Sequence, residues 1–329
     1  MGNVVERWEA SLRGDVRTWE AVESQVTRVL VPLARNVDEA EASPYKVRFA
    51  NGATIFPRVL TTVVDQPAPP IGTGAGRRAV RSFRGTYEKK PWKDINDLEG
   101  VVEEQFIHPL VLGENVLPYR MLPPAHTVLP ITPAGRLVEP SAHPGLADWW
   151  GQASTHWDAR RSSSMSLVEN VDYRRKLTQQ YPLPPHRVAM AHSAMHVAAC
   201  RVTVEGAVIE HQLDWCAVQG VEEGLYLCAV LNSPVVTEAV TPHMTSGKGG
   251  GRHIGKSLWN VPIPQYVSGD ALHKRLAELG RAAEAVVADL VLRGRTHGAM
   301  RREVRAALAA GPGTQIDDLV AELLGGTGG

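Results

Sequence analysis

One stretch of the chain combines many basic side chains with aromatic ones. Residues 77–93 hold seven cations against a single acid, Glu88, so the stretch carries six net positive charges, and Phe83, Tyr87 and Trp92 are interleaved with them. Cations suit contacts to phosphate, and aromatic rings suit stacking on bases. A solvated loop in an arginine-rich protein is the alternative interpretation. The candidate DNA-binding residues of this stretch are Arg77, Arg78, Arg81, Arg84, Lys89, Lys90 and Lys93.

A second basic stretch, residues 246–257, contains five glycines and no acid. Glycine lets the backbone approach a ligand closely, so main-chain N–H groups and nearby cations can bind an anion together. The phosphate of a nucleic acid fits this pattern as well as the phosphate of a nucleotide. The candidate DNA-binding residues here are Lys248, Arg252, His253 and Lys256.

Residues 250–257 also match the letters of the nucleotide-binding phosphate loop, GxxxxGK[ST]. Such a loop needs a buried strand before it and a long helix after it. The preceding TPHMTSGKG is no buried strand, and Pro262 and Pro264 prevent a sustained helix. We therefore expect a chance match.

Three other patterns are weaker. Residues 72–76 read GTGAG but follow PAPPI instead of a strand, which predicts a flexible turn. His192 and His196 have the spacing of helical zinc ligands, but the glutamate of HExxH is missing, so we expect structural or surface histidines. The three cysteines form no CxxC pair, which argues against a disulfide framework and a structural zinc site. No metal is expected.

Composition limits the class of protein. With 329 residues, 43% of them hydrophobic and 21% charged, the chain is long enough for two domains of an ordinary soluble protein. Lys+Arg and Asp+Glu are both 35, so coating of nucleic acid through bulk charge is excluded, while a local basic face remains possible. The N-terminus does not read as a signal peptide, and no run approaches the ~18 apolar residues of a membrane helix. We expect a cytoplasmic protein with no membrane partner.

The elements that must position these residues differ along the chain. In residues 1–43 a weak apolar stripe, interrupted at Gly14, suggests a helix. The stretch 141–180 reads as helical, and Asp270 can cap a C-terminal helix that Gly294 ends, followed by helices over 299–310 and 316–324. Short β-rich runs between turn signals predict strands within residues 46–49, 53–64, 79–83, 126–131, 187–191, 196–206, 207–218 and 225–231.

Several segments, taken in order, resemble one family. They are NGATIFPRVL (51–60), YEKKPW (87–92), HPLVLGENVLPYR (108–120), ADWWGQASTHW (147–157), LCAVLNSPV (227–235), GGRHIGKSLWNVPIPQY (250–266) and the closing IDDLVAELL. The chain resembles the C-terminal half of adenine-specific DNA methyltransferases of restriction–modification systems, a TaqI-like target-recognition domain. The resemblance implies an α+β fold, with a β-rich target-recognition domain, helical insertions and a C-terminal helical tail. It also implies double-stranded DNA as the partner.

That resemblance divides the chain into three parts. Residues 1–44 would be a remnant of, or linker to, a catalytic domain; residues 45–267 would be the recognition domain; and residues 268–329 would be the helical region. In the family, catalysis uses a glycine-bearing S-adenosylmethionine loop and an (N/D/S)-PP-(Y/F/W) motif. The three PP pairs of this chain stand in APPI, LPPA and LPPH, without the required neighbours.

We therefore expect no catalytic residues and no cofactor in this chain. S-adenosylmethionine would belong to a missing catalytic domain or to a separate catalytic methyltransferase subunit. The chain would be a split subunit, a fragment or a truncated frame. Two alternatives stay open: a degenerate or truncated protein kept as an interaction module without DNA binding, and a nucleotide-binding enzyme that uses residues 250–257.

Overall fold

The structure is a computed structural model that describes residues 4–10, 18–32, 42–70, 72–85, 88–244, 246–247, 250–251, 254–294 and 296–325. The chain forms two compact units, Met1–Ala42 and Ser43–Gly329. Each helix in the described part is too short or too polar to span a membrane. The helices α8 to α10 of the C-terminal region belong to the same unit as the two large sheets.

The first unit is a β-hairpin with a short helix. Strands β1 (Val4–Ala10) and β2 (Val26–Pro32) pair antiparallel along their whole lengths. Helix α1 (Trp19–Glu23) lies between them in sequence and is capped by the Thr18 side chain. The helix expected across residues 1–43 is therefore wrong. Both strands are rich in valine, whose β-branched side chain favours extended backbone over helix.

The second unit contains two large sheets, and its helices and sheets together confirm the α+β class. The six-stranded sheet has the order β13 (Val208–Ile209), β7 (Ile107–Val111), β10 (Ala125–Val128), β4 (Thr62–Asp65), β5 (Arg77–Ser82) and β6 (Glu99–Glu103). The four-stranded antiparallel sheet has the order β12 (Ala199–Val202), β11 (Arg187–Ala191), β14 (Leu213–Ala217) and β3 (Ala50–Asn51). Two small hairpins are β8 (Val116–Leu117) with β9 (Arg120–Met121), and β15 (Ser246–Gly247) with β16 (Gly250–Gly251).

Helices of very different lengths accompany these sheets. They are α2 (Arg58–Thr61), α3 (Pro144–Asp158), α4 (Leu167–Val171), α5 (Val221–Asn232), α6 (Pro234–Val240), α7 (Ile254–Ser257), α8 (Ala271–Ala288), α9 (His297–Ala309) and α10 (Gly313–Gly325).

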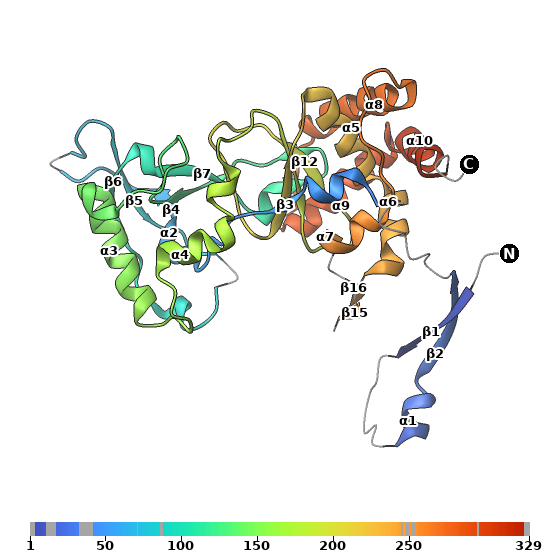
Figure 1. The fold of residues 1–329 in the computed structure, drawn as a ribbon, viewed down its shortest axis with the longest axis horizontal. Helices are drawn as coiled ribbons and strands as arrows, with labels where there is room; N and C mark the ends of the chain where they lie inside the picture. Colours follow the sequence, from blue (N-terminus) through green and yellow to red (C-terminus); the bar gives the residue numbers. More distant parts are fainter. Residues whose placement is uncertain are drawn as a thin grey trace. The chain divides into compact units, whose positions relative to one another are not determined.

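Helix α3 covers one face of the six-stranded sheet (Figure 1). Its buried side chains include Leu146, Trp149, Ala153 and Trp157, which recur every three or four residues, as on one face of a helix. The indole N–H of Trp149 donates to the carbonyl of Leu60 at 3.0 Å, so the largest buried side chain of this core also has its polar atom satisfied. The three tryptophans of the segment 147–157 are thus part of the core.

Helix α5 lies at the centre of the other large core, against α8 and the four-stranded sheet. The strand expected over residues 225–231 is wrong, since these residues form the middle of α5. A fully apolar run of seven residues has the composition of a buried strand and of a buried helix alike. Here all seven side chains are buried, so the alternation that identifies a half-exposed strand is absent.

A smaller third core connects the two sheets. Val111 of β7 and Ile209 of β13 pack in it with residues of β11, β12 and β14, including Ala189 and Trp215. Strands β13 and β7 pair in parallel, and β13 precedes β14 by only a few residues. Residues 210–212, which connect β13 to β14, are therefore held between the sheets.

Several sequence boundaries differ from the structure. Residues 46–49 fall largely within a 3-10 turn, Pro44–Val47, instead of a strand, and residues 53–64 contain α2 before the short β4. Asp270 does cap α8 by accepting from the backbone N–H of His273 at 2.9 Å. The helix ends at Ala288, well before Gly294, and the Arg120 side chain donates to the backbone carbonyls of Val287 and Leu290 at this end.

Close packing of α5 and α8 depends on Gly280. A Cβ at this position would lie 2.5 Å from the Leu225 carbonyl oxygen. We expect Gly280→Ala to lower the free energy of unfolding by about 1–3 kcal/mol, because the overpacking outweighs the gain in helix propensity. The matched control is Gly151→Ala in α3, where a Cβ meets open space. It should raise stability by about 0.5–1 kcal/mol. Denaturant unfolding measures both, and equal effects would contradict this account of the packing.

Candidate nucleic-acid interface

Acids from neighbouring strands and from the segment just after it largely neutralise the first basic stretch. Arg77 pairs with Glu103 at 3.3 Å, Arg78 with Asp65 at 2.5 Å, Arg81 and Arg84 with Asp97, and Lys90 with Asp94 at 3.6 Å. These four acids reduce the net charge of the region from six to two. The structure therefore corrects the charge count made from the sequence, because β4 and β6 bring in Asp65 and Glu103, while Asp94 and Asp97 lie just after the stretch.

Arg84 has a structural role in this region. Its guanidinium donates to the backbone carbonyls of Lys93, at 3.1 Å, and Ile95, and it pairs with Asp97. It thereby holds the segment that follows β5 against the segment that precedes β6. Lys89 and Lys93 are exposed, and within the part of the chain that the structure describes neither has an ion-pair partner.

The second basic stretch falls mostly outside the described residues. Lys248, Arg252 and His253 lie outside them, and Lys256 is described only as part of the backbone of α7. That helix has four residues and continues into a 3-10 turn, Leu258–Asn260. The arrangement differs from a nucleotide-binding loop, which leads from a buried strand into a long helix. Figure 1 shows hairpin β15–β16 apart from β5.

Gly255 fixes the end of this second stretch against the four-stranded sheet. Its N–H donates to the backbone carbonyl of His192 at 3.2 Å. A Cβ at this position would collide with the Asp214 carboxylate and the His192 ring, so only glycine fits. The glycine of the GxxxxGK[ST] match is thus needed for close approach to a histidine–aspartate pair.

A chain of hydrogen bonds runs from this pair across the sheet. The Asp214 carboxylate accepts from Nδ1 of His192 at 2.7 Å, which fixes the orientation of the ring. Its other oxygen accepts from the Asn51 side chain at 3.1 Å, and Oδ1 of Asn51 accepts from Nζ of Lys176 at 2.7 Å. Four segments far apart in sequence therefore meet here. The sequence predicted a structural or surface histidine at His192 and pointed to none of the other three residues, since no spacing connects them.

A buried ion-pair system lies beside this chain. Glu210 is fully buried, and its Oε1 accepts from Arg58 at 2.8 Å and from the Gly113 N–H at 3.2 Å. Arg58 also donates to Glu114 at 2.8 Å, and Oε2 of Glu210 has no hydrogen-bond partner among the described residues. Burial raises the pKa of Glu210 to about 7, because the attraction of Arg58 does not offset the loss of hydration.

The pKa of His211 depends on its burial and on the charged groups around it. Burial lowers its pKa most, and the nearby Arg58, Lys176 and His192 lower it in the same direction, so that the pKa is about 4 in total. The ring is therefore neutral at physiological pH. The side chains of Arg58, Lys176, His192 and His211 thus bring many nitrogen atoms together. The carboxyl groups of Asp214 and Glu210 lie among them and are hydrogen-bonded to side chains of the same region.

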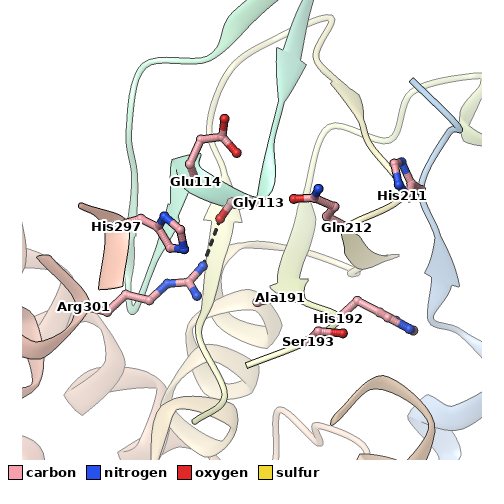
Figure 2. A pocket seen from close by; sticks show the side chains of 9 residues that line it. All are labelled: Gly113, Glu114, Ala191, His192, Ser193, His211, Gln212, His297 and Arg301. Atoms are coloured by element: carbon pink, nitrogen blue, oxygen red, sulfur yellow. Dashed lines mark hydrogen bonds between the residues drawn. The ribbon is translucent and has the colours of Figure 1, made fainter. Parts of the chain in front are cut away.

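A cavity of about 270 Å³ opens next to this region (Figure 2). Figure 2 shows His192, Ser193, His211 and Gln212 on one side and Glu114, His297 and Arg301 on the other. Arg301 is buried and donates to the carbonyls of Gly113 and Val116, so it serves the fold. No group of three or more His, Cys, Asp or Glu side chains that could hold a metal ion is found in the described part of the chain.

Comparison with known proteins gives distant structural similarity alone. No family model matches the sequence, and no curated protein matches it. Over 69% of its length the chain is similar to the type IIL restriction-modification enzyme MmeI, solved in complex with DNA, with 13% identity and a TM-score of 0.45. Over 93% it is similar to the type IIG restriction endonuclease BpuSI, with 12% identity and a TM-score of 0.33. It covers 29% and 37% of those chains, respectively.

The raised pKa of Glu210 predicts how stability depends on pH. The carboxyl titrates near 4.5 when unfolded and near 7 when buried, so folding takes up a proton between these values. The stability that protonated Glu210 contributes is complete below pH 4.5 and is lost as the pH rises through 7. The free energy of unfolding of the wild type minus that of Glu210→Gln should thus fall by about 1–3 kcal/mol from pH 5 to pH 8.

The matched control is Glu103→Gln. Burial raises the pKa of Glu103, but backbone hydrogen bonds, including those from Gly145 and Leu146, lower it more, and the net shift is downward. Its difference from the wild type should therefore stay constant over the same pH range. A constant difference for Glu210→Gln as well would contradict the assignment.

Proposed function

We propose that this chain is the DNA-recognition part of a restriction–modification system, specifically of an adenine-specific, S-adenosylmethionine-dependent DNA methyltransferase. The finer assignment rests on the sequence resemblance of residues 45–325. The observation that carries DNA binding is the hydrogen-bonded chain from Lys176 through Asn51 and Asp214 to His192, with Gly255 seated on it.

This arrangement suits a polyanion. It seats the end of a glycine-rich, acid-free basic stretch on a region that already contains Lys176 and His192. Lys176 and His192 supply the nitrogen groups that contacts to phosphate use. The carboxylate within the region, Asp214, is bound to His192 and Asn51 and so repels a phosphate less than an unpartnered acid would.

In this proposal the DNA-recognition part holds the duplex and reads its base sequence. An enzyme that modifies a base must take the base out of the duplex, which happens in a catalytic domain. A recognition domain fixes the register through phosphate contacts and reads base edges in the major groove. In the first basic stretch, we assign phosphate contacts to Lys89 and Lys93, since Arg84 is committed to the fold.

A protein without DNA binding is the competing function. The observation that favours it is the pairing of five of the seven cations in the first basic stretch. Salt dependence separates the two functions, because each phosphate contact releases counterions.

Duplex DNA binding by the whole chain should weaken steeply with salt. With about 4–6 phosphate contacts, log K against log salt should have a slope of about −4 to −5. Fluorescence anisotropy with a mixed-sequence duplex between 50 and 300 mM salt measures it, at roughly the range where such contacts are resolved. A flat response, or no binding, would favour the interaction module.

The double variant Lys89→Ala/Lys93→Ala should make that slope shallower by about two and weaken binding to all sequences alike. Both side chains are exposed, so the fold should be unaffected. The control is Arg275→Ala/Arg281→Ala on α8, where two exposed arginines pair with Glu278 and Glu222. Equal losses in the two double variants would show a bulk charge effect and would remove these lysines from the interface.

The isolated chain should not transfer methyl groups, since neither family signature of catalysis is found in its sequence. Incubation with labelled S-adenosylmethionine and mixed-sequence duplex should leave the DNA unlabelled. Label on adenine, with contaminating enzyme excluded, would show that the chain contains its own catalytic site.

A further inference from the structure

Residues Tyr173–Arg175 form a short exposed turn with an unusual backbone. Arg174 has φ 56° and ψ 31°, and Arg175 has φ 60°, so two successive arginines occupy the left-handed region. A side chain with a Cβ disfavours this region, and glycine is the residue that adopts it without strain. The turn interrupts the helix expected across 141–180. The turn thus has two long cationic side chains at positions whose backbone conformation favours glycine.

Both ends of the turn are firmly attached. Before it, Oδ1 of Asp172 accepts from the backbone N–H groups of Leu177 and Thr178, at 3.0 and 2.9 Å. The N–H of Arg175 donates to the Asp172 carbonyl at 2.7 Å. After it, Lys176 is bound to Asn51. These contacts over-determine the turn, so its strain persists because the surroundings impose it.

The side chains between these anchors point to solvent. Tyr173, Arg174 and Arg175 are exposed, and the Arg174 guanidinium lies 5.2 Å from the centre of the Tyr173 ring. Neither arginine has an ion-pair partner in the part of the chain that the structure describes, unlike Arg77, Arg78, Arg81 and Arg84. Neither charge is therefore neutralised by an acid within the described chain, and Arg174 makes a side-chain contact with the Tyr173 ring.

The turn is continuous with the interface described above. Lys176, the next residue, begins the hydrogen-bonded chain that ends at His192 and Gly255. The same cations influence His211 at the opening of the cavity. A duplex bound over the hydrogen-bonded chain from Lys176 to His192 would thus have this rigid turn beside it.

We propose that Tyr173–Arg175 reads base edges of duplex DNA, with Arg174 and Arg175 as the reading side chains. The inference rests on the proposed DNA-recognition function and assigns specificity to this turn. A guanidinium can bind O6 and N7 of guanine with two hydrogen bonds, and this pairing needs a planar group held in a defined direction. The fixed backbone and the Tyr173 ring supply that direction for Arg174. A phosphate contact can also be made by a lysine as a point charge, so it does not require a planar group in a fixed direction.

The experiment is selection from a randomised duplex library with the full chain. The wild type should enrich a sequence that contains guanine at one or two positions. Arg174→Ala and Arg175→Ala should each lower the preference at one position by about fivefold to 100-fold, leaving the other positions unchanged. Arg174→Lys and Arg175→Lys keep the charge but lose the planar fork, so they should lose the same guanine preference while the salt slope stays as in the wild type.

A fifth variant separates readout from folding. Arg175→Gly removes the side chain and relieves the left-handed strain, so its Tm should equal or exceed that of the wild type while the guanine preference is lost. A residue needed only for the turn would show the opposite: a lower Tm and an unchanged sequence preference. The matched control is Arg275→Ala on α8, which should change neither quantity.

Each outcome decides one point. If the wild type selects a sequence and all the arginine variants select the same one, the turn does not read bases and the proposal is overturned, while DNA recognition stands. If the lysine variants retain the guanine preference and only alanine shallows the salt slope, the contacts are to phosphate and base reading is likewise overturned. If the wild type binds no duplex, the proposed function fails, and base reading fails with it.

Discussion

The interaction on which the candidate interface depends is that of the Asn51 side chain with the loop before β14. Its Nδ2 donates to the carbonyls of His211 and Leu213 and to the Asp214 carboxylate, while its Oδ1 accepts from Lys176. One amide thus uses both of its ends, and an amide is the side chain that can donate and accept in this way. Aspartate here could not donate to the two carbonyls, and leucine could do neither.

The consequences extend in two directions from this contact. Towards the glycine-rich stretch, Asp214 orients His192, and the two leave no room for a side chain at Gly255. Towards the turn after α4, Lys176 anchors one end of the strained arginines. Hydrophobic packing positions the backbone that carries these groups, since residues of β13 and β14 pack together in the small third core. The polar chain then places the charged groups on that backbone.

Charge distribution in the folded chain differs from charge distribution along the sequence. The stretch 77–93 is strongly basic as a sequence, yet Asp65, Asp97 and Glu103 approach it through sheet pairing and through the segments that flank the strands. The turn at 173–175 is short and forms no basic run in the sequence, yet its two arginines have no ion-pair partner among the described residues. A net-charge window along the chain cannot separate these cases, because ion pairing is set by neighbours in space.

How much the sequence predicts depends on the range of the interaction. Asp270 begins α8 as expected, since a helix cap is a contact between residues three apart. The helix expected at the start of residues 141–180 likewise forms as α3, and its buried residues recur every three or four positions. The strand predicted over residues 225–231 was wrong because local composition does not distinguish a buried helix from a buried strand. Only packing against α8 and the sheet decides between them.

By itself the sequence determined the α+β class, the C-terminal helices, the two basic stretches and the resemblance that suggests DNA recognition. Tertiary structure alone decided which cations are paired, why Gly255 must be glycine, and that Lys176, Asn51, Asp214 and His192 form one chain. The physical reason is that hydrogen bonds and ion pairs act over about 3–4 Å in space. Residues more than a hundred positions apart in sequence meet that condition only after the sheets have paired.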